Sequence, residues 1–197
     1  MCDREAALST HLSIENELHA EADRLLSGGL QDMLDTFGDV HIVGSYALGL
    51  MTWRDLDIHV VREPLERGAF FDLGRRIADH LQPHRMHFRD ETIEATPGLP
   101  RGLYWGVYLG NEREGAWKID IWATSSANFE PTRRFCDAIA KRLTPETRES
   151  ILQIKAACWQ HPEYRRGFSS ADIYEAVFEH GVRTVDQFWS LRRRTSH

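Results

Sequence analysis

The sequence lacks any apolar run that approaches the roughly 20 residues a membrane-spanning helix needs. Its first residues include Asp3, Arg4 and Glu5, where a signal peptide would lead into an apolar segment. Both absences argue against a membrane-bound or secreted protein. The sequence therefore predicts a soluble, cytoplasmic protein that does not associate with membranes.

The sequence also has few cysteines and no excess of positive charge. The three cysteines, Cys2, Cys136 and Cys158, are odd in number and have no metal-ligand spacing, which indicates reduced thiols rather than a disulfide framework. The formal net charge is −6. A polynucleotide-binding enzyme usually carries a basic footprint, so this charge argues against a long nucleic acid as substrate, although a local basic patch can coexist with it.

The length of 197 residues allows one hydrophobic core and a small helical appendage. Hydrophobic periodicity predicts the secondary structure. Helices are expected at 3–27, 30–37, 65–81, 131–143, 144–160, 170–179 and 184–193, with Pro64 leading the third helix and Ser170 and Thr184 as N-caps. Strands are expected at 40–43, 55–61, 84–88, 103–109 and 116–124. Strands therefore give way to a purely helical region at about residue 130.

Two of these expected strands contain acidic side chains. Asp55 and Asp57 are two residues apart, so they project from the same face of their strand. Neighbouring carboxylates repel each other, and a hard divalent cation such as Mg²⁺ neutralises them. Asp120 shares a face with Lys118 and Trp122 on a later strand. If the two strands pair, about 4.8 Å apart, the three acids lie together.

A Gly-Ser pair precedes the acidic strand. Gly44 lets the backbone approach a ligand, and the helix start near Ser45 offers free N–H groups to an anion. A metal pair beside a phosphate site is what nucleotidyl transfer requires. Each part alone also has a simpler explanation: a common turn, solvated acids, or an Asp120 that pairs with Lys118 or an arginine. Their joint order along the chain favours the catalytic interpretation.

Together, Gly44-Ser45, nine intervening residues, Asp55-Leu56-Asp57-Ile58 and the later Asp120 resemble the signature of the DNA polymerase beta-type nucleotidyltransferase superfamily. The resemblance covers roughly residues 40–123. It implies an α/β (α+β) fold, with a mixed β-sheet flanked by helices and a C-terminal helical bundle. The implied catalytic domain spans residues 1–129 and the helical subdomain residues 130–197.

The same resemblance implies two Mg²⁺ ions, with Mn²⁺ as a possible substitute. Asp55 and Asp57 would hold both ions, and Asp120 only the ion nearer the acceptor. A looser similarity to the helical region of poly(A) polymerase-like enzymes places Lys155 and Ser170 at the triphosphate, although Ala171 stands where that family often has tyrosine. The alternative is that Lys155 lies on a solvated face and Ser170 only caps a helix.

These features predict the transfer of a nucleoside monophosphate from a nucleoside triphosphate, with ATP as the expected donor. A small hydroxylated acceptor, such as an aminoglycoside-like antibiotic, fits the short, acidic chain. The loop acids Glu91, Glu94, Glu112 and Glu114 would attract a cationic acceptor of this kind. One alternative is a macromolecular acceptor, either a tRNA end or a partner toxin protein. The other is a nucleotide- or partner-binding module without turnover.

Overall fold

The computed structural model describes residues 2–195, and side-chain burial for residues 10–194. The helices are α1 (Cys2–Leu25), α2 (Gln31–Asp35), α3 (Gly44–Leu48), α4 (Arg67–Leu81), α5 (Ser126–Ala140), α6 (Pro145–Cys158), α7 (Ser170–Glu179) and α8 (Val185–Thr195). A π-turn, η1 (Leu26–Leu30), joins α1 to α2, and a 3-10 turn, η2 (Glu112–Glu114), lies between β4 and β5. In the described part of the chain, no helix has the length and apolar character to cross a membrane.

The strands form one five-stranded mixed sheet. They are β1 (Asp39–Val43), β2 (Asp55–Val61), β3 (Arg85–Asp90), β4 (Leu103–Tyr108) and β5 (Lys118–Thr124), in the order β1-β2-β5-β4-β3. β2 and β5 are parallel, and the other neighbouring strands are antiparallel. The predicted α/β fold with a mixed sheet is confirmed. The strand that carries Asp120 (β5) also lies beside the strand that carries Asp55 and Asp57 (β2), as predicted.

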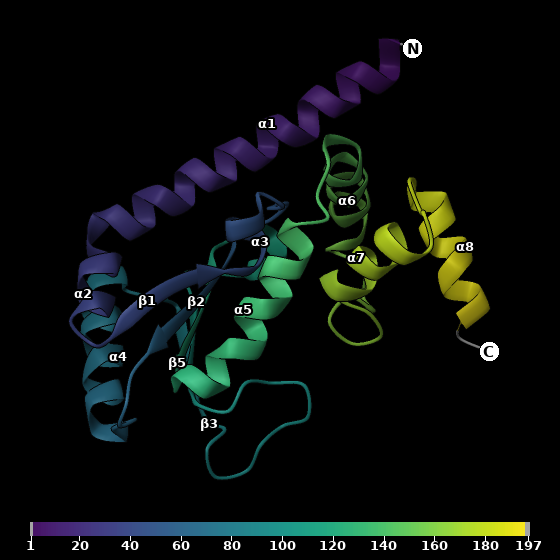
Figure 1. Cartoon of the computed structure of the whole chain (residues 1–197). Coiled ribbons are helices and arrows are strands. Elements are labelled where there is room, and N and C mark those ends of the chain that lie inside the picture. The colour runs from purple at the N-terminus through teal and green to yellow at the C-terminus, as the bar shows by residue number, and fades with distance from the viewer. Residues whose placement is uncertain (1, 196–197) are drawn as a thin grey trace.

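Helices cover both faces of the sheet, with α4 and α5 on opposite sides (Figure 1). The strand period sends the apolar residues of β2 and β5 to one face, where they form the main core with α4 and parts of α1 and α2. Leu56, Ile58, Ile119 and Ile121 are fully buried there. The opposite face, which carries the acidic residues, packs against α3 and α5 at β1 and β2.

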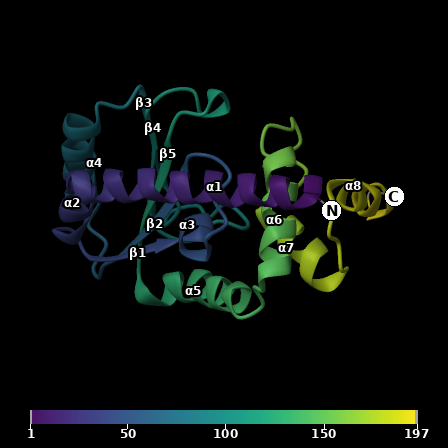
Figure 2. The ribbon, with the colours of Figure 1, turned by 90° about the horizontal axis from the view of Figure 1, so that it is seen from above.

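A second core lies in the helical region and holds residues of α6, α7 and α8 together with Leu48 and Leu50. The long helix α1 runs over the sheet and on to α6 (Figures 1 and 2). It contributes Leu18 and Ala22 to the main core, while Leu12 packs on the second. α1 thus braces the helical region against the sheet.

Several predicted boundaries differ from the structure. α5 begins at Ser126, because the Ser125 hydroxyl accepts the Asn128 N–H as an N-cap, and Pro131 lies inside the helix. Pro64 follows a cis peptide bond and precedes α4, so its predicted place in the first helical turn is wrong. Thr184 does act as a cap, since its hydroxyl accepts the Gln187 N–H at 3.3 Å.

The described cysteines behave as expected. Cys136 and Cys158 are free thiols, as predicted. The side chain of Cys2 lies outside the residues whose burial is described.

Candidate active site

The pairing of β2 with β5 brings the three predicted acids together. Asp57 lies directly opposite Asp120, and Asp55 lies opposite Lys118. Because residues two apart share a face of a strand, Asp55, Asp57, Lys118 and Asp120 all project from the face opposite the main core. The sheet register therefore builds a carboxylate cluster with one lysine inside it.

Two cations hold the outer acids of this cluster. Lys118 Nζ lies 3.6 Å from Asp55 Oδ1 and makes a close ion pair with Asp120 Oδ2. Arg165 Nη2 lies 2.5 Å from Asp55 Oδ2, and Tyr104 donates its hydroxyl to Asp120 Oδ1 at 2.6 Å. Burial alone would raise the pKa of Asp55, but the charges of Lys118 and Arg165 together lower it. The pairing of Asp120 with Lys118, weighed above as an alternative, is thus present in the structure.

Asp57 lies between these acids in the least favourable electrostatic position. Burial, followed by the charges of Asp55 and Asp120, raises the pKa of Asp57 to about 7. A carboxyl group with so high a pKa is one that the protein does not fully neutralise with its own cations. An additional cation at this point would restore Asp57 to its charged form.

The donor set of the cluster fits a hard divalent cation. It consists of carboxylate oxygens, the ligands that Mg²⁺ prefers, and Asp55 Oδ1 is buried without a hydrogen-bond partner among the described residues. As the side chains stand, no group of three His, Cys, Asp or Glu residues between 10 and 194 is arranged to hold a metal ion. The Lys118 ammonium lies between Asp55 and Asp120, so it must move before a metal ion can bind both.

Gly44 is required by its close approach to Asp57. Its φ of 63° lies in the left-handed region, and a Cβ atom added at this position would overlap with Asp57 Oδ2. The glycine that sequence reasoning assigned to a phosphate therefore also makes room for the central acid.

The predicted nucleotide residues Ser45 and Lys155 contact each other. Lys155 Nζ donates to Ser45 Oγ at 2.8 Å and to the Leu50 carbonyl at 2.6 Å, although the two side chains are 110 residues apart. Lys155 is fully buried, which excludes the alternative of a solvated face. Burial lowers the pKa of Lys155 to about 7.

Ser170 joins the same network, and its predicted capping role is wrong. The N-cap of α7 is Ser169, whose hydroxyl accepts the Ala171 N–H at 3.2 Å. The Ser170 hydroxyl is therefore available elsewhere, and it lies 2.7 Å from the Tyr164 hydroxyl. Burial raises the pKa of the Tyr174 phenol, and the Ser45 and Ser170 hydroxyls both oppose this rise, so Tyr174 lies close to both serines. Gly44, Ser45, Lys155 and Ser170 thus converge from three separate segments.

A glycine-to-alanine pair tests the role of Gly44. Gly181 has a nearly identical φ of 64° but open space around its Cα, so G181A pays only the left-handed strain of about 1 kcal/mol. We expect G44A to lose about 2 kcal/mol more, because its methyl group displaces Asp57. Urea unfolding of both variants measures the difference. Equal losses would show that Asp57 is not held against Gly44.

Sequence reasoning missed Arg165 and Trp53. Arg165 has a left-handed φ of 66° and reaches Asp55 across 110 residues of sequence, from the loop between α6 and α7. The Trp53 ring lies 4.8 Å from Lys155 Nζ, measured to the ring centroid. The left-handed arginine marks local strain of the kind found at functional sites, but no sequence pattern signals it.

Comparison with known proteins identifies the fold. No family model and no curated protein sequence matches the chain. Among solved structures, a cytoplasmic RNA terminal U-transferase superposes with a TM-score of 0.57 at 14% identity, covering 88% of this chain and 53% of that one. The fold is that of a nucleotidyltransferase. The Cid1 RNA terminal uridylyl transferase gives 0.57 at 15% identity, with 88% and 52% coverage, and the GLD-2/RNP-8 complex gives 0.52 at 13%, with 89% and 64%.

The present chain, with its nucleotidyltransferase fold, spans only about half to two thirds of the length of the chains it matches. The superpositions cover 88–89% of the present chain. At such low identity the likeness establishes the fold, and the chemistry must be inferred from the site.

Proposed function

We propose that this chain is a Mg²⁺-dependent nucleotidyltransferase that moves a nucleoside monophosphate from a nucleoside triphosphate to the terminal hydroxyl of a polynucleotide. One observation carries the proposal: three carboxylates on adjacent strands lie near the buried Lys155 and the half-buried Ser45 and Ser170. The first group suits metal ions and the second suits phosphates, which are the two requirements of nucleotidyl transfer.

Each side chain has a role in this proposal. Asp55 and Asp57 would hold two Mg²⁺ ions, for which Mn²⁺ could substitute, and Asp120 would hold only the ion nearer the acceptor. When bound, the ions supply positive charge to the triphosphate and lower the pKa of the acceptor hydroxyl. Lys155, Ser45 and Ser170 bind and orient the β- and γ-phosphates, so that pyrophosphate is aligned to leave. Asp120 accepts the proton of the acceptor hydroxyl.

The choice of acceptor follows the fold neighbours and the local charges. The neighbours are RNA terminal transferases, and a further Cid1 structure with a TM-score of 0.53 is described as bound to MgATP. Glu91, assigned above to attracting a cationic acceptor, is buried and paired with Arg89. A small-molecule acceptor is the second candidate, supported by the net charge of −6.

Transfer of label from each of four α-labelled nucleoside triphosphates tests the proposal. The reactions contain Mg²⁺ and, separately, single-stranded RNA, tRNA, an aminoglycoside or a mixture of proteins. We expect label on RNA, none with excess EDTA, and none on RNA that ends in a 3′-deoxynucleotide. Label on the aminoglycoside alone would establish the second candidate. Label on protein alone would indicate a partner protein, and label nowhere would indicate a binding module.

A further inference from the structure

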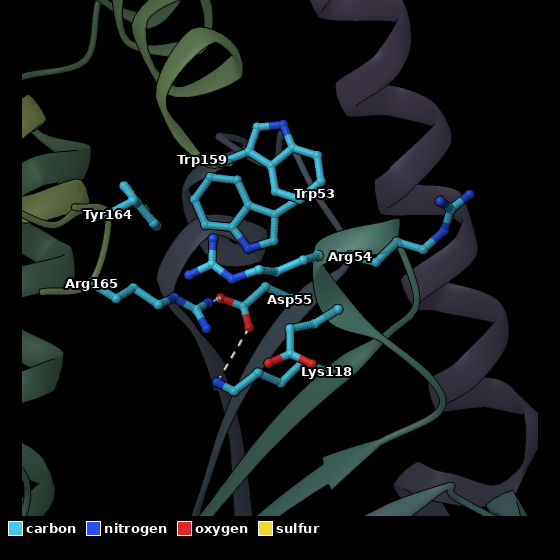
Figure 3. A pocket seen from close by; sticks show the side chains of 9 residues that line it. Trp53, Arg54, Asp55, Lys118, Trp159, Tyr164 and Arg165 are labelled. Atoms are coloured by element: carbon cyan, nitrogen blue, oxygen red, sulfur yellow. Dashed lines mark hydrogen bonds and ion pairs between the residues drawn. The ribbon is translucent and has the colours of Figure 1, made fainter. Parts of the chain in front are cut away.

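A cleft with a volume of about 100 Å³ opens beside Asp55, between the sheet and the loop that follows α6 (Figure 3). This volume is below the roughly 300–1,000 Å³ of pockets that enclose a whole ligand, so a bound ligand would lie partly outside the cleft. The wall from the sheet side and the wall from the helical side face each other across it. The lining residues are Trp53, Arg54, Asp55, Glu112, Arg113, Lys118, Trp159, Tyr164 and Arg165.

Cationic side chains outnumber acidic ones in this lining. It has four cationic side chains and two acidic ones, a formal excess of two positive charges on a chain whose net charge is −6. Arg54 is committed to Glu21 at 2.6 Å, and Lys118 and Arg165 are paired with the acids of the cluster. Arg113 is exposed and forms no ion pair with any residue that the structure describes. Among the described residues, Arg113 is thus the one cationic side chain of the cleft that no acid neutralises, and an anion would bind there.

Aromatic rings form the other part of the lining. The indoles of Trp53 and Trp159 stack with ring planes 17° apart and centroids 6.0 Å apart, and Tyr164 meets Trp53 edge-on. Figure 3 shows the two indoles at one side of the cleft, with Asp55, Lys118 and Arg165 beneath them. Indole surfaces next to arginines are the common means of binding a base and its phosphate.

The cleft is distinct from the proposed triphosphate network. Lys155 contacts the Trp53 ring but does not line the cleft, so Trp53 lies between the Ser45-Lys155 pair and the cleft. Lys118, which does line it, is the ion-pair partner of Asp120. Under the proposed function Asp120 is the acid on the acceptor side. The cleft therefore opens onto Asp55 and onto Lys118, which links Asp55 to Asp120 on the acceptor side.

We infer that this cleft binds the 3′-terminal nucleotide of a single-stranded polynucleotide acceptor, with its base against Trp53 and Trp159 and its phosphate at Arg113. The inference rests on the proposed function, because that function assigns Asp120 to the acceptor side of the carboxylate cluster. It assigns the cleft to a negatively charged acceptor, which the total charge of the chain does not suggest.

Quenching of tryptophan fluorescence tests the inference without turnover. A single-stranded hexaribonucleotide is titrated in EDTA into wild type, R113E and R166E. Arg166 is exposed, two residues after Tyr164, and does not line the cleft, so R166E makes the same change in net charge. We expect R113E to weaken binding about tenfold, as for loss of a charged phosphate contact, and R166E to change it less than about twofold.

Two further titrations separate the base from the phosphate and the acceptor from the donor. A hexaribonucleotide with an abasic 3′-terminal residue should lose most of the quenching, because no base reaches the indoles. ATP should bind wild type and R113E with the same affinity. Equal binding of RNA by R113E and R166E, full quenching by the abasic RNA, or weaker ATP binding by R113E would each overturn the inference.

These outcomes are independent of the labelling experiment. If no acceptor is labelled but RNA binds with this pattern, the proposed transfer activity fails while the cleft assignment stands. If RNA is labelled but R113E binds RNA as R166E does, the activity stands and the cleft assignment fails.

Discussion

Replacing Asp57 by asparagine abolishes Mg²⁺-dependent transfer and leaves the protein folded. Asp57 is the central acid of the cluster, opposite Asp120 and two residues from Asp55. An amide removes one charge from the metal site, and metal ions contribute several kcal/mol to such reactions. A loss of about 4 kcal/mol corresponds to about a 10³-fold fall in kcat/KM. Activity within tenfold of wild type would remove Asp57 from the metal site.

The same substitution should stabilise the metal-free protein at high pH. The pKa of Asp57 is raised from 3.8 to about 7, so the folded state holds a proton that the unfolded state releases. Wild type therefore loses stability as the pH rises between these values, and the full penalty applies above pH 7. Its upper limit is about 4 kcal/mol. The amide introduced by D57N does not ionise, so this variant should gain on wild type between pH 4 and pH 8.

Urea unfolding in EDTA at pH 4 and pH 8 measures this gain. At pH 4, D57N and wild type should have nearly the same free energy of unfolding. At pH 8, the free energy of unfolding of D57N should be higher by a few kcal/mol. A difference that does not change with pH would show that Asp57 carries no raised pKa in the folded protein. Excess Mg²⁺ should reduce the advantage of D57N, because bound cations neutralise the wild-type carboxylate.

Replacing Lys118 by methionine should destabilise the metal-free protein and strengthen its response to metal. Lys118 is 8% exposed and neutralises both Asp55 and Asp120. Removing one partner of a buried ion pair costs about 3–5 kcal/mol, because the remaining charges stay buried. In K118M the acids are free of the ammonium that separates them. We expect the Mg²⁺ concentration needed for half-maximal stabilisation to fall about tenfold.

Thermal unfolding over a Mg²⁺ titration tests this prediction, with Lys141→Met as the matched control. Lys141 is exposed, so K141M removes the same charge without touching the acids. K141M should unfold and respond to Mg²⁺ as wild type does. If K118M shows the same Mg²⁺ midpoint as K141M, Lys118 does not compete with metal for the carboxylates.

Patterns local to one segment were enough to predict the sheet and the acids. The alternation of Asp55 and Asp57 with buried residues fixes the face of β2, and the same period places Asp120 on β5. The pairing of these strands was predicted and is confirmed. Lys155 was singled out only by the similarity to poly(A) polymerase-like enzymes, which left its environment open, since a buried and a solvated lysine look alike in sequence.

Features that depend on the tertiary fold could not be predicted in this way. Arg165 reaches Asp55 from a loop with a left-handed residue, and no periodicity applies to such a loop. Ser170 was mistaken for an N-cap because its neighbour Ser169 has the same chemistry. Trp53 precedes the acidic strand, and only the position of α6 gives it Trp159 as a partner.

Crystals soaked with Mn²⁺ and a non-hydrolysable nucleoside triphosphate test the central claim most directly, through anomalous scattering at the manganese edge. The account predicts a peak within coordination distance of carboxylate oxygens of Asp55 and Asp57, a contact of Asp120 with the ion on the acceptor side, and Lys118 Nζ displaced from between Asp55 and Asp120. A nucleotide-bound crystal with no peak at these oxygens, and with Lys118 still paired to both acids, would contradict it.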